Sequence, residues 1–274
     1  MVETFWYQRQ DDRPDGLGEK DIQVLKESGE RKNITMTHTL VVIPAYNEEE
    51  RIGSVIQGIK EYLPSAHVLV VDDGSGDRTR RQATEAGAKV LSHPFNLGYG
   101  AALQTGYRYA LKKNYEEIVQ MDGDGQHDPS FITHLLAIIR KGEADIAIGS
   151  RFLQAPALVS EGRPYRPPLM RLLGMWIFGI ITSLVTRQKI TDPTSGYQAM
   201  NRRVLEWASS DQFPYDYPDA DVIIMLHRAG FRIREVAVQM FENRDKKSMH
   251  SGWKPLYYVF KMFLSILVTL IRKV

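Results

Sequence analysis

The feature that most constrains the fold is an alternation of short apolar runs and helical segments between residues 39 and 152. Five runs have the composition of buried strands, at residues 39–46, 67–75, 88–94, 116–125 and 144–152. The segments between them, at 47–63, 77–87, 96–114 and 130–142, are typical of helices, and Asn47 is expected to cap the first. This order predicts an α/β fold with a mainly parallel sheet flanked by helices.

In such a sheet the ligand-binding residues lie at the carboxyl ends of the strands. The segments that follow the five expected strands are therefore expected around one crevice. They are PAYNEE, VDDGS, HPFNLGYG, MDGDGQHDP and GSRF.

The acidic loop VQMDGDGQHDP is the strongest local signal in the chain. Asp122, Asp124 and the amide of Gln126 offer oxygen ligands at alternate positions, which suits Mg²⁺ or Mn²⁺ held together with substrate phosphates. The alternative is a solvated turn whose acids cap the next helix, and Asp128 is expected to act as such a cap. His127 is expected to be a hydrogen-bonding partner and is not assigned to the metal.

The preceding acidic turn, VDDGSGDRT, offers Asp72 and Asp73. One of these carboxylates could accept a hydrogen bond from a base or ribose, or the turn could be structural, with Asp77 capping the next helix.

NLGYGAAL resembles the start of a dinucleotide fingerprint, but Leu103 stands at the third glycine position. We therefore interpret it as a flexible turn on the substrate side.

The second part of the chain, from about residue 151, has a different pattern. A basic, proline-rich loop at 163–168 precedes a long apolar segment at 168–187. A turn follows, with a helix expected to begin near Ser195, and then an expected edge strand at 231–244. A basic loop at 245–254 leads into a second apolar segment at 255–274.

Composition limits the classes of partner. The chain of 274 residues has 43% hydrophobic and 25% charged residues, enough for a sizeable core, and its formal net charge of +2 does not favour nucleic acid. It has no cysteine, which excludes disulfides and thiolate metal sites. Residues 1–36 are polar, show no secretory signal, and are expected to form a loosely ordered arm.

Four motifs in one order, IPAYNEEERI, VVDDGSGDRT, FNLGYGAAL and VQMDGDGQHDP, resemble the catalytic domain of family-2 glycosyltransferases. The resemblance spans residues 39–254 and is strongest to the branch of dolichol-phosphate mannose synthase and the polyprenyl-phosphate glycosyltransferases. It implies a GT-A (nucleotide-diphospho-sugar transferase) fold and inverting, metal-dependent transfer from a nucleotide-diphospho-sugar. It also implies that Asp122, Asp124 and Gln126 hold Mg²⁺ or Mn²⁺. The nucleotide-sugar residues that it implies are Pro44, Ala45, Tyr46, Glu48, Asp73, Asp122, Gly123 and Asp124.

The acceptor in this branch is a polyprenyl (dolichyl or undecaprenyl) phosphate, and its phosphate needs positive charge beside the diphosphate. Arginine suits that role because its planar fork binds phosphate bidentately. The candidates are Arg151, Arg202, Arg203 and Arg244, with a surface ion pair as the alternative for each. Arg151 is the strongest, since it follows a strand on the crevice side. The branch carries R-x-x-G-x-S-K near residue 244, whereas NRDKKSMHSGWK stands here and leaves the roles of Lys246, Lys247 and His250 open.

A lipid acceptor implies a membrane surface. Residues 255–271 carry one charge, Lys261, and are marginal for a span, which needs about 20 apolar residues. Polar residues recur every fourth position from Tyr257 to Lys273, so we expect a helix in the plane of the interface, with a tilted span or a protein–protein contact as alternatives. The segment at 169–186 is similar, or else it is buried against the catalytic domain. The expected location is the cytoplasmic face of a membrane, peripheral or monotopic, and a homo-oligomer is possible.

These inferences divide the chain into an arm (1–36), a catalytic domain (37–254, with 151–254 on the acceptor side) and a membrane-associating helix (255–274). Two other functions stay open. One is a family-2 transferase that acts on a polysaccharide or protein, and the other is a catalytically inactive membrane adaptor. A sugar nucleotidyltransferase is excluded, because it would carry a glycine-rich, basic loop where PAYNEEE stands.

Overall fold

The computed structural model describes residues 39–153, 169–214, 219–242 and 254–271, without the side chains of 169–171 and 254–260. The expected N-terminal arm and the basic loop around residue 244 lie outside these residues. The strands are β1 (Thr39–Ala45), β2 (His67–Asp72), β3 (Lys89–Ser92), β4 (Glu117–Gln120), β5 (Ile146–Ser150), β6 (Gln198–Asn201) and β7 (Ile233–Ala237). The helices are α2 (Ile52–Tyr62), α3 (Thr79–Glu85), α4 (Tyr99–Lys112), η1 (Pro129–Phe131), α5 (Ile132–Arg140), α6 (Leu169–Thr186), α7 (Arg202–Ala208), α8 (Ala220–Arg228) and α9 (Lys254–Ile271).

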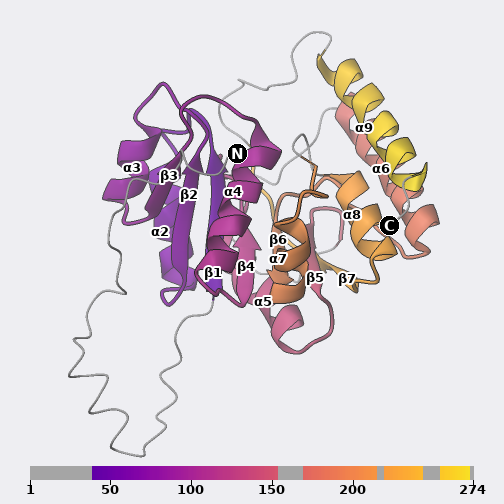
Figure 1. Ribbon diagram of the computed structural model, residues 1–274, viewed down its shortest axis with the longest axis horizontal. Helices are drawn as coiled ribbons and strands as arrows, with labels where there is room; N and C mark the ends of the chain where they lie inside the picture. Colours follow the sequence, from indigo (N-terminus) through magenta and orange to yellow (C-terminus); the bar gives the residue numbers. More distant parts are fainter. Residues whose placement is uncertain (1–38, 154–168, 215–218, 243–253, 272–274) are drawn as a thin grey trace, which may run out of the picture. The chain divides into compact units, whose positions relative to one another are not determined.

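The seven strands form one sheet in the order β3-β2-β1-β4-β6-β5-β7 (Figure 1). Only β6 runs antiparallel to its neighbours in the part of the chain that the structure describes. All seven residues of β1 are buried, as expected for a strand covered on both faces. The expected α/β architecture with a mainly parallel sheet is therefore confirmed.

Helices cover both faces of the sheet. On one face α2, α3 and α5 pack over side chains such as Val41, Val70 and Val119. On the other face α4, α7 and α8 pack over the alternate side chains of the same strands, such as Val42 and Leu69. This alternation follows from the two-residue period of a strand.

Outside α8 lies a further pair of helices, α6 and α9 (Figure 1). α8 presents Val222 and Leu226 to the sheet and Ala220 and Ile224 to this outer pair. The Phe178 ring of α6 lies 5.4 Å from the Phe263 ring of α9. None of the helices in the described ranges is long and apolar enough to cross a membrane.

The order of the strands determines where the ligand-binding crevice lies. From β1 the chain moves outward to β2 and β3, and it then returns to β4 on the other side of β1. Ligands of open α/β sheets bind at such a switch point, outside the carboxyl ends of the strands. Here those ends are the residues after Ala45 and after Gln120.

Two local predictions are corrected, and one helix was not predicted. No helix begins near Ser195, because Gln198–Asn201 first pairs as β6 with β4 and β5, and helix α7 follows it. Helix α8 had no counterpart in the sequence analysis. Asn47 does not cap α2, which begins at Ile52, and its side chain accepts a hydrogen bond from Gly76 N at 2.9 Å.

Candidate active site

The loop after β4 carries the two acids expected to bind a metal. Oδ1 of Asp122 accepts a hydrogen bond from the Tyr99 hydroxyl at 2.8 Å, and the Asp122 side chain keeps 31% exposure. Oδ1 of Asp124 accepts from Gln126 N at 3.0 Å, which closes the turn. Asp128 accepts from Ser130 N at 2.9 Å and caps the short helix η1, as expected.

Negative charge accumulates at this edge of the sheet. Burial and the charge of Asp122 raise the pKa of Asp124. Burial also raises the pKa of Glu48 to about 7. The positive charge of Arg51 lowers this pKa, whereas the charges of Asp124 and Asp122 raise it further. Asp122 thus raises the pKa of Asp124, and both raise the pKa of Glu48, so a bound cation would relieve the repulsion at this edge.

The residues present fit a divalent cation that takes some of its ligands from the protein and the others from a substrate. Among the described residues no group of three or more His, Cys, Asp or Glu side chains is arranged to hold a metal by itself. Mg²⁺ in particular binds through one or two carboxylates together with substrate phosphates. Asp122 and Asp124 are such a pair, and Gln126 lies in the same turn.

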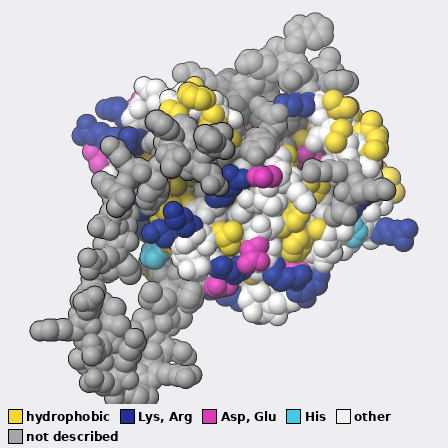
Figure 2. Space-filling view, viewed as in Figure 1, with side chains coloured by type: hydrophobic (Ala, Val, Ile, Leu, Met, Phe, Trp, Pro, Cys, Tyr) yellow, Lys and Arg dark blue, Asp and Glu magenta, His cyan; other side chains and the backbone are white. Residues whose placement is uncertain are grey.

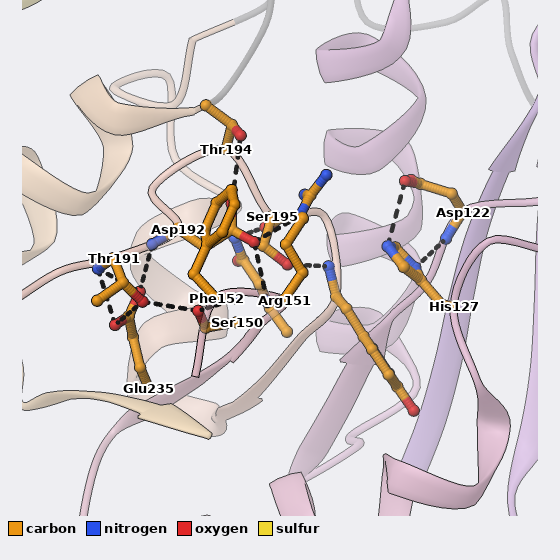
Figure 3. Close-up of polar contacts among 12 residues, drawn as sticks. Asp122, His127, Ser150, Arg151, Phe152, Thr191, Asp192, Thr194, Ser195 and Glu235 are labelled. Carbon is orange, nitrogen blue, oxygen red and sulfur yellow. Dashed lines mark hydrogen bonds and ion pairs between the residues drawn. The ribbon is translucent and has the colours of Figure 1, made fainter. Parts of the chain in front are cut away.

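His127 supports this loop from behind. Its Nδ1 accepts a hydrogen bond from Asp122 N at 3.2 Å (Figure 3). Its ring stacks on Tyr197 with 4.8 Å between centroids. Burial lowers the pKa of His127 to about 4, so the ring is neutral at physiological pH. The imidazole therefore holds the backbone of the loop.

The loop after β1 forms the other side of the switch point. Ala45 O accepts from Asp73 N at 2.8 Å, which ties the ends of β1 and β2 together, and the Tyr46 side chain is 48% exposed beyond them. Pro44 is buried in β1, and its carbonyl lies beside Gly123. Glu48 N donates to the Thr79 hydroxyl at 2.7 Å, so the acidic turn after β2 fixes this loop.

Asp73 is buried beneath the 93–98 loop. Its carboxylate accepts hydrogen bonds from Leu97 N at 2.9 Å and Gly98 N at 2.8 Å, and it contacts His93 Nδ1 at 2.7 Å. The structure thus gives Asp73 a loop-holding role, and its contact with a nucleotide stays a prediction. The sequence analysis missed His93, although the residue stands in the quoted segment HPFNLGYG.

Arg151 lies at the end of β5, on the same edge of the sheet. Its Nε donates to Oδ2 of Asp192 at 2.6 Å, and the Asp192 side chain has no exposed surface. Glu235 of β7 accepts from Asp192 N at 2.7 Å and from Thr191 N at 2.8 Å, so it fixes the loop that carries Asp192 (Figure 3). Asp192 and Glu235 were not predicted, and no local sequence signal distinguished them.

Arg151 and Asp122 follow strand ends on the same edge of the sheet. Gln120 of β4 and Ile148 of β5 pair with the same residue, Gln198, so Asp122 and Ser150 are level in the sheet. Since one strand separates them, their backbones lie about 10 Å apart. The charge of Arg151 also contributes to the low pKa of His127.

The other proposed acceptor arginines are not at this edge. Arg202 contacts Glu116 and Glu206, and Arg203 contacts Asp145, at the opposite end of the sheet. β6 causes this, because it runs antiparallel and carries the chain away from the crevice before these arginines. The prediction for Arg202 and Arg203 is therefore wrong, and Arg244 lies outside the described residues.

Comparison with known proteins decides the family. The model of glycosyl transferase family 2 matches residues 40–207. The chain belongs to this family. It is 33% identical over 223 residues to the polyprenol monophosphomannose synthase of Mycolicibacterium smegmatis, covering 78% of this chain and 81% of that one. It is 31% identical over 221 residues to the undecaprenyl-phosphate mannosyltransferase of Micrococcus luteus, covering 78% and 87%.

A solved structure gives the fold of this family-2 glycosyltransferase. Glucosyl-3-phosphoglycerate synthase from Mycobacterium tuberculosis, in complex with Mn²⁺ and UDP-glucose, aligns with a TM-score of 0.60 and 23% identity. The alignment covers 94% of this chain and 84% of that chain. The expected GT-A fold and glycosyltransferase class are confirmed.

Proposed function

We propose that this glycosyltransferase moves a sugar from a nucleotide-diphospho-sugar to a polyprenyl phosphate, with inversion at the anomeric carbon and with Mg²⁺ or Mn²⁺. The observation that carries the proposal is the pairing of two loops on one sheet edge. The acidic loop at Asp122 and Asp124 suits a metal–diphosphate donor, and Arg151 suits a second, anionic substrate. The relatives named for transfer to polyprenyl and undecaprenyl phosphate support this acceptor class.

The donor side lies at the switch point. Pro44, Ala45, Tyr46 and Glu48 follow β1 and are proposed to contact the base and ribose, together with Asp73. Asp122 and Asp124 would hold the cation on the diphosphate, with Gln126 as a further oxygen ligand and Gly123 allowing close approach. The bound cation would stabilise the negative charge that develops on the leaving diphosphate.

The acceptor supplies its own nucleophile. A phosphomonoester has a second pKa of about 6, so its oxygens are already ionised near neutral pH. One of these oxygens forms a bond to the anomeric carbon as the bond to the donor's β-phosphate oxygen breaks, and the nucleoside diphosphate leaves. Arg151 would bind the attacking phosphate and offset its repulsion by the diphosphate, so the reaction needs no general base.

A membrane surface is the proposed location of the acceptor. The outward side chains of α9 include Leu264 (49% exposed), Leu267 (53%) and Val268 (54%), and α6 adds Trp176 (62%) and Leu184 (73%). Figure 2 shows hydrophobic side chains gathered over the outer helices at the right of the view. We call these side chains of α6 and α9 the outer apolar face.

Ser265 and Thr269 of α9 lie on the opposite side of the helix, and Thr269 is buried. The Ser265 hydroxyl donates to Asp221 of α8, and Arg228 of α8 donates to the Thr269 carbonyl. In the described part of α9, Ser265 and Thr269 therefore lie on the side of α8, and Leu264, Leu267 and Val268 lie outward. This polarity suits an in-plane contact with lipid at the cytoplasmic face of a membrane.

The test is sugar transfer to a short polyprenyl phosphate with Mn²⁺ or Mg²⁺. UDP-glucose, UDP-N-acetylglucosamine and GDP-mannose are each tried with the wild type and with Asp124→Asn, which keeps the shape of the side chain and removes its charge. The proposal expects one donor to be used, with activity lost in the variant or in EDTA. Transfer to a polysaccharide or protein but not to lipid phosphate would support the alternative acceptor, and an absence of metal-dependent donor binding would support the adaptor.

A further inference from the structure

A chain of hydrogen bonds leads from the buried core to the carboxylate of Asp122. The Tyr107 hydroxyl donates to Oε1 of Gln120, and Nε2 of Gln120 donates to the Tyr99 hydroxyl at 3.0 Å. The Tyr99 hydroxyl in turn donates to Oδ1 of Asp122 at 2.8 Å. All three hydrogen bonds are donated in the direction of Asp122. This follows because the ionised carboxylate can only accept, so the Tyr99 hydroxyl donates to it and accepts from Gln120.

The members of the chain come from two rigid elements. Tyr99 and Tyr107 lie two turns apart on α4, and Gln120 is the last residue of β4. Tyr107 is 1% exposed and Gln120 is 3% exposed, so a broken bond here would leave a buried polar group without a partner. The orientation of the Tyr99 hydroxyl is therefore fixed by the core behind it.

Gly196 lies against the last of these hydrogen bonds, the one between Tyr99 and Asp122. A methyl group added at Gly196 would lie 2.8 Å from the Tyr99 hydroxyl oxygen and 3.0 Å from both carboxylate oxygens of Asp122. Such close contacts would force the Tyr99 hydroxyl or the Asp122 carboxylate to move, so glycine at this position lets the loop before β6 pass over the Tyr99–Asp122 bond without displacing it. Asp122 is thus held from α4, from β4 and from the loop before β6, while 31% of its side chain faces the crevice.

We propose that Tyr99 is a positioning residue that orients Asp122 toward a divalent cation, with Gln120 and Tyr107 fixing Tyr99 and with Gly196 leaving room for the contact. The inference rests on the proposed function, because it requires that Asp122 binds the cation. Hydrogen-bond partners of a metal ligand set the direction of its oxygens, and their loss weakens metal binding by about 10- to 100-fold.

The experiment measures Mn²⁺ binding by electron paramagnetic resonance, in the presence of UDP or GDP, with the whole chain. Tyr99→Phe removes only the hydroxyl, and Tyr109→Phe on the same helix is the matched control. We expect Mn²⁺ affinity to fall by about 10- to 100-fold in the first variant and to stay within twofold in the control. Nucleotide binding in EDTA should be equal in all three proteins, at a temperature where each is folded.

A second variant keeps the inference testable if Tyr99→Phe does not fold. Gly196→Ala should weaken Mn²⁺ binding in the same way, whereas Gly53→Ala, which has no atom within 4 Å of the added carbon, should not. Unchanged Mn²⁺ affinity in the folded variants, or an equal loss of nucleotide binding in EDTA, overturns the positioning role. If the wild type binds no Mn²⁺ with either nucleotide, the metal dependence in the proposed function falls as well, which distinguishes the two failures.

Discussion

Nε of Arg151 lies 2.6 Å from Oδ2 of Asp192, a carboxylate with no exposed surface. Asp192 N in turn donates to Glu235 at 2.7 Å, so an edge-strand carboxylate fixes the backbone beside the ion pair. The proposed acceptor arginine is therefore oriented by residues far from it in sequence. Removing one partner of such a buried ion pair strongly destabilises the protein, because the other charge stays buried without a partner.

Asp192→Asn should impair transfer more than donor binding. The amide keeps the shape of the side chain but releases Arg151 from a fixed direction, and a misplacement of about 1 Å can cost about 100-fold in rate. We expect kcat/KM for lipid phosphate to fall by about 10- to 100-fold, with donor affinity within twofold of the wild type. Steady-state kinetics with each substrate varied would measure both.

The matched control is Asp211→Asn, which makes the same change in the exposed Arg108–Asp211 pair. Exposed pairs contribute little, so this variant should behave as the wild type. Acceptor kinetics that are equal in the two variants would remove Asp192 from the acceptor site.

His127 should make the fold sensitive to acid. Its pKa is about 4 in the folded protein, below the ordinary value of 6.5, so the unfolded chain takes up a proton first as the pH falls. The stability from this group is complete above pH 6.5 and is lost as the pH falls from 6.5 to 4. The loss is about 3 kcal/mol, since one pKa unit corresponds to about 1.4 kcal/mol.

Urea unfolding of the wild type and His127→Gln at several pH values would test this contribution. The raised pKa values of Glu48 and Asp124 act in the opposite direction over part of this range, so the difference between the two proteins is the quantity to follow. A difference that does not change between pH 7 and pH 4 would contradict a neutral, buried His127.

The outer apolar face should bind lipid. Leu267→Glu together with Leu264→Glu places two charges on exposed positions of α9, and we expect binding to anionic vesicles to fall by at least tenfold in a flotation assay. Tyr62→Glu is the control, because Tyr62 is also an exposed hydrophobic residue, on α2 (46%). Equal flotation of the two variants would exclude α9 as the contact.

Two glycines in helices should respond oppositely to the same substitution. A methyl group at Gly106 of α4 would meet Val42 Cγ1 at 2.3 Å, whereas one at Gly53 of α2 meets nothing within 4 Å. Gly106→Ala should therefore destabilise the fold by about 1–3 kcal/mol through overpacking. Gly53→Ala should stabilise it by about 0.5–1 kcal/mol, and thermal unfolding would show both signs. A Gly106→Ala protein as stable as the wild type would mean that α4 packs less closely on β1.

Residues near a strand end were predictable, and residues placed by long-range pairing were not. Asp122, Asp124 and Arg151 follow apolar runs, and the rule for parallel sheets brings them to one edge. Arg202 and Arg203 were misplaced because the antiparallel pairing of β6 depends on strands about 50 to 80 residues earlier. Asp192 and Glu235 act through buried hydrogen bonds between segments distant in sequence, and composition and periodicity carry no record of such contacts.

The need for a phosphate on the acceptor tests the account most directly. Polyprenyl phosphate and the corresponding polyprenol differ only in that group, and both can be offered in the same vesicles with the accepted donor and Mn²⁺. The account predicts transfer to the polyprenyl phosphate, its reduction in Arg151→Ala, and no transfer to the polyprenol. Equal transfer to the polyprenol would contradict it, since a hydroxyl acceptor requires a general base and gives Arg151 no phosphate to bind.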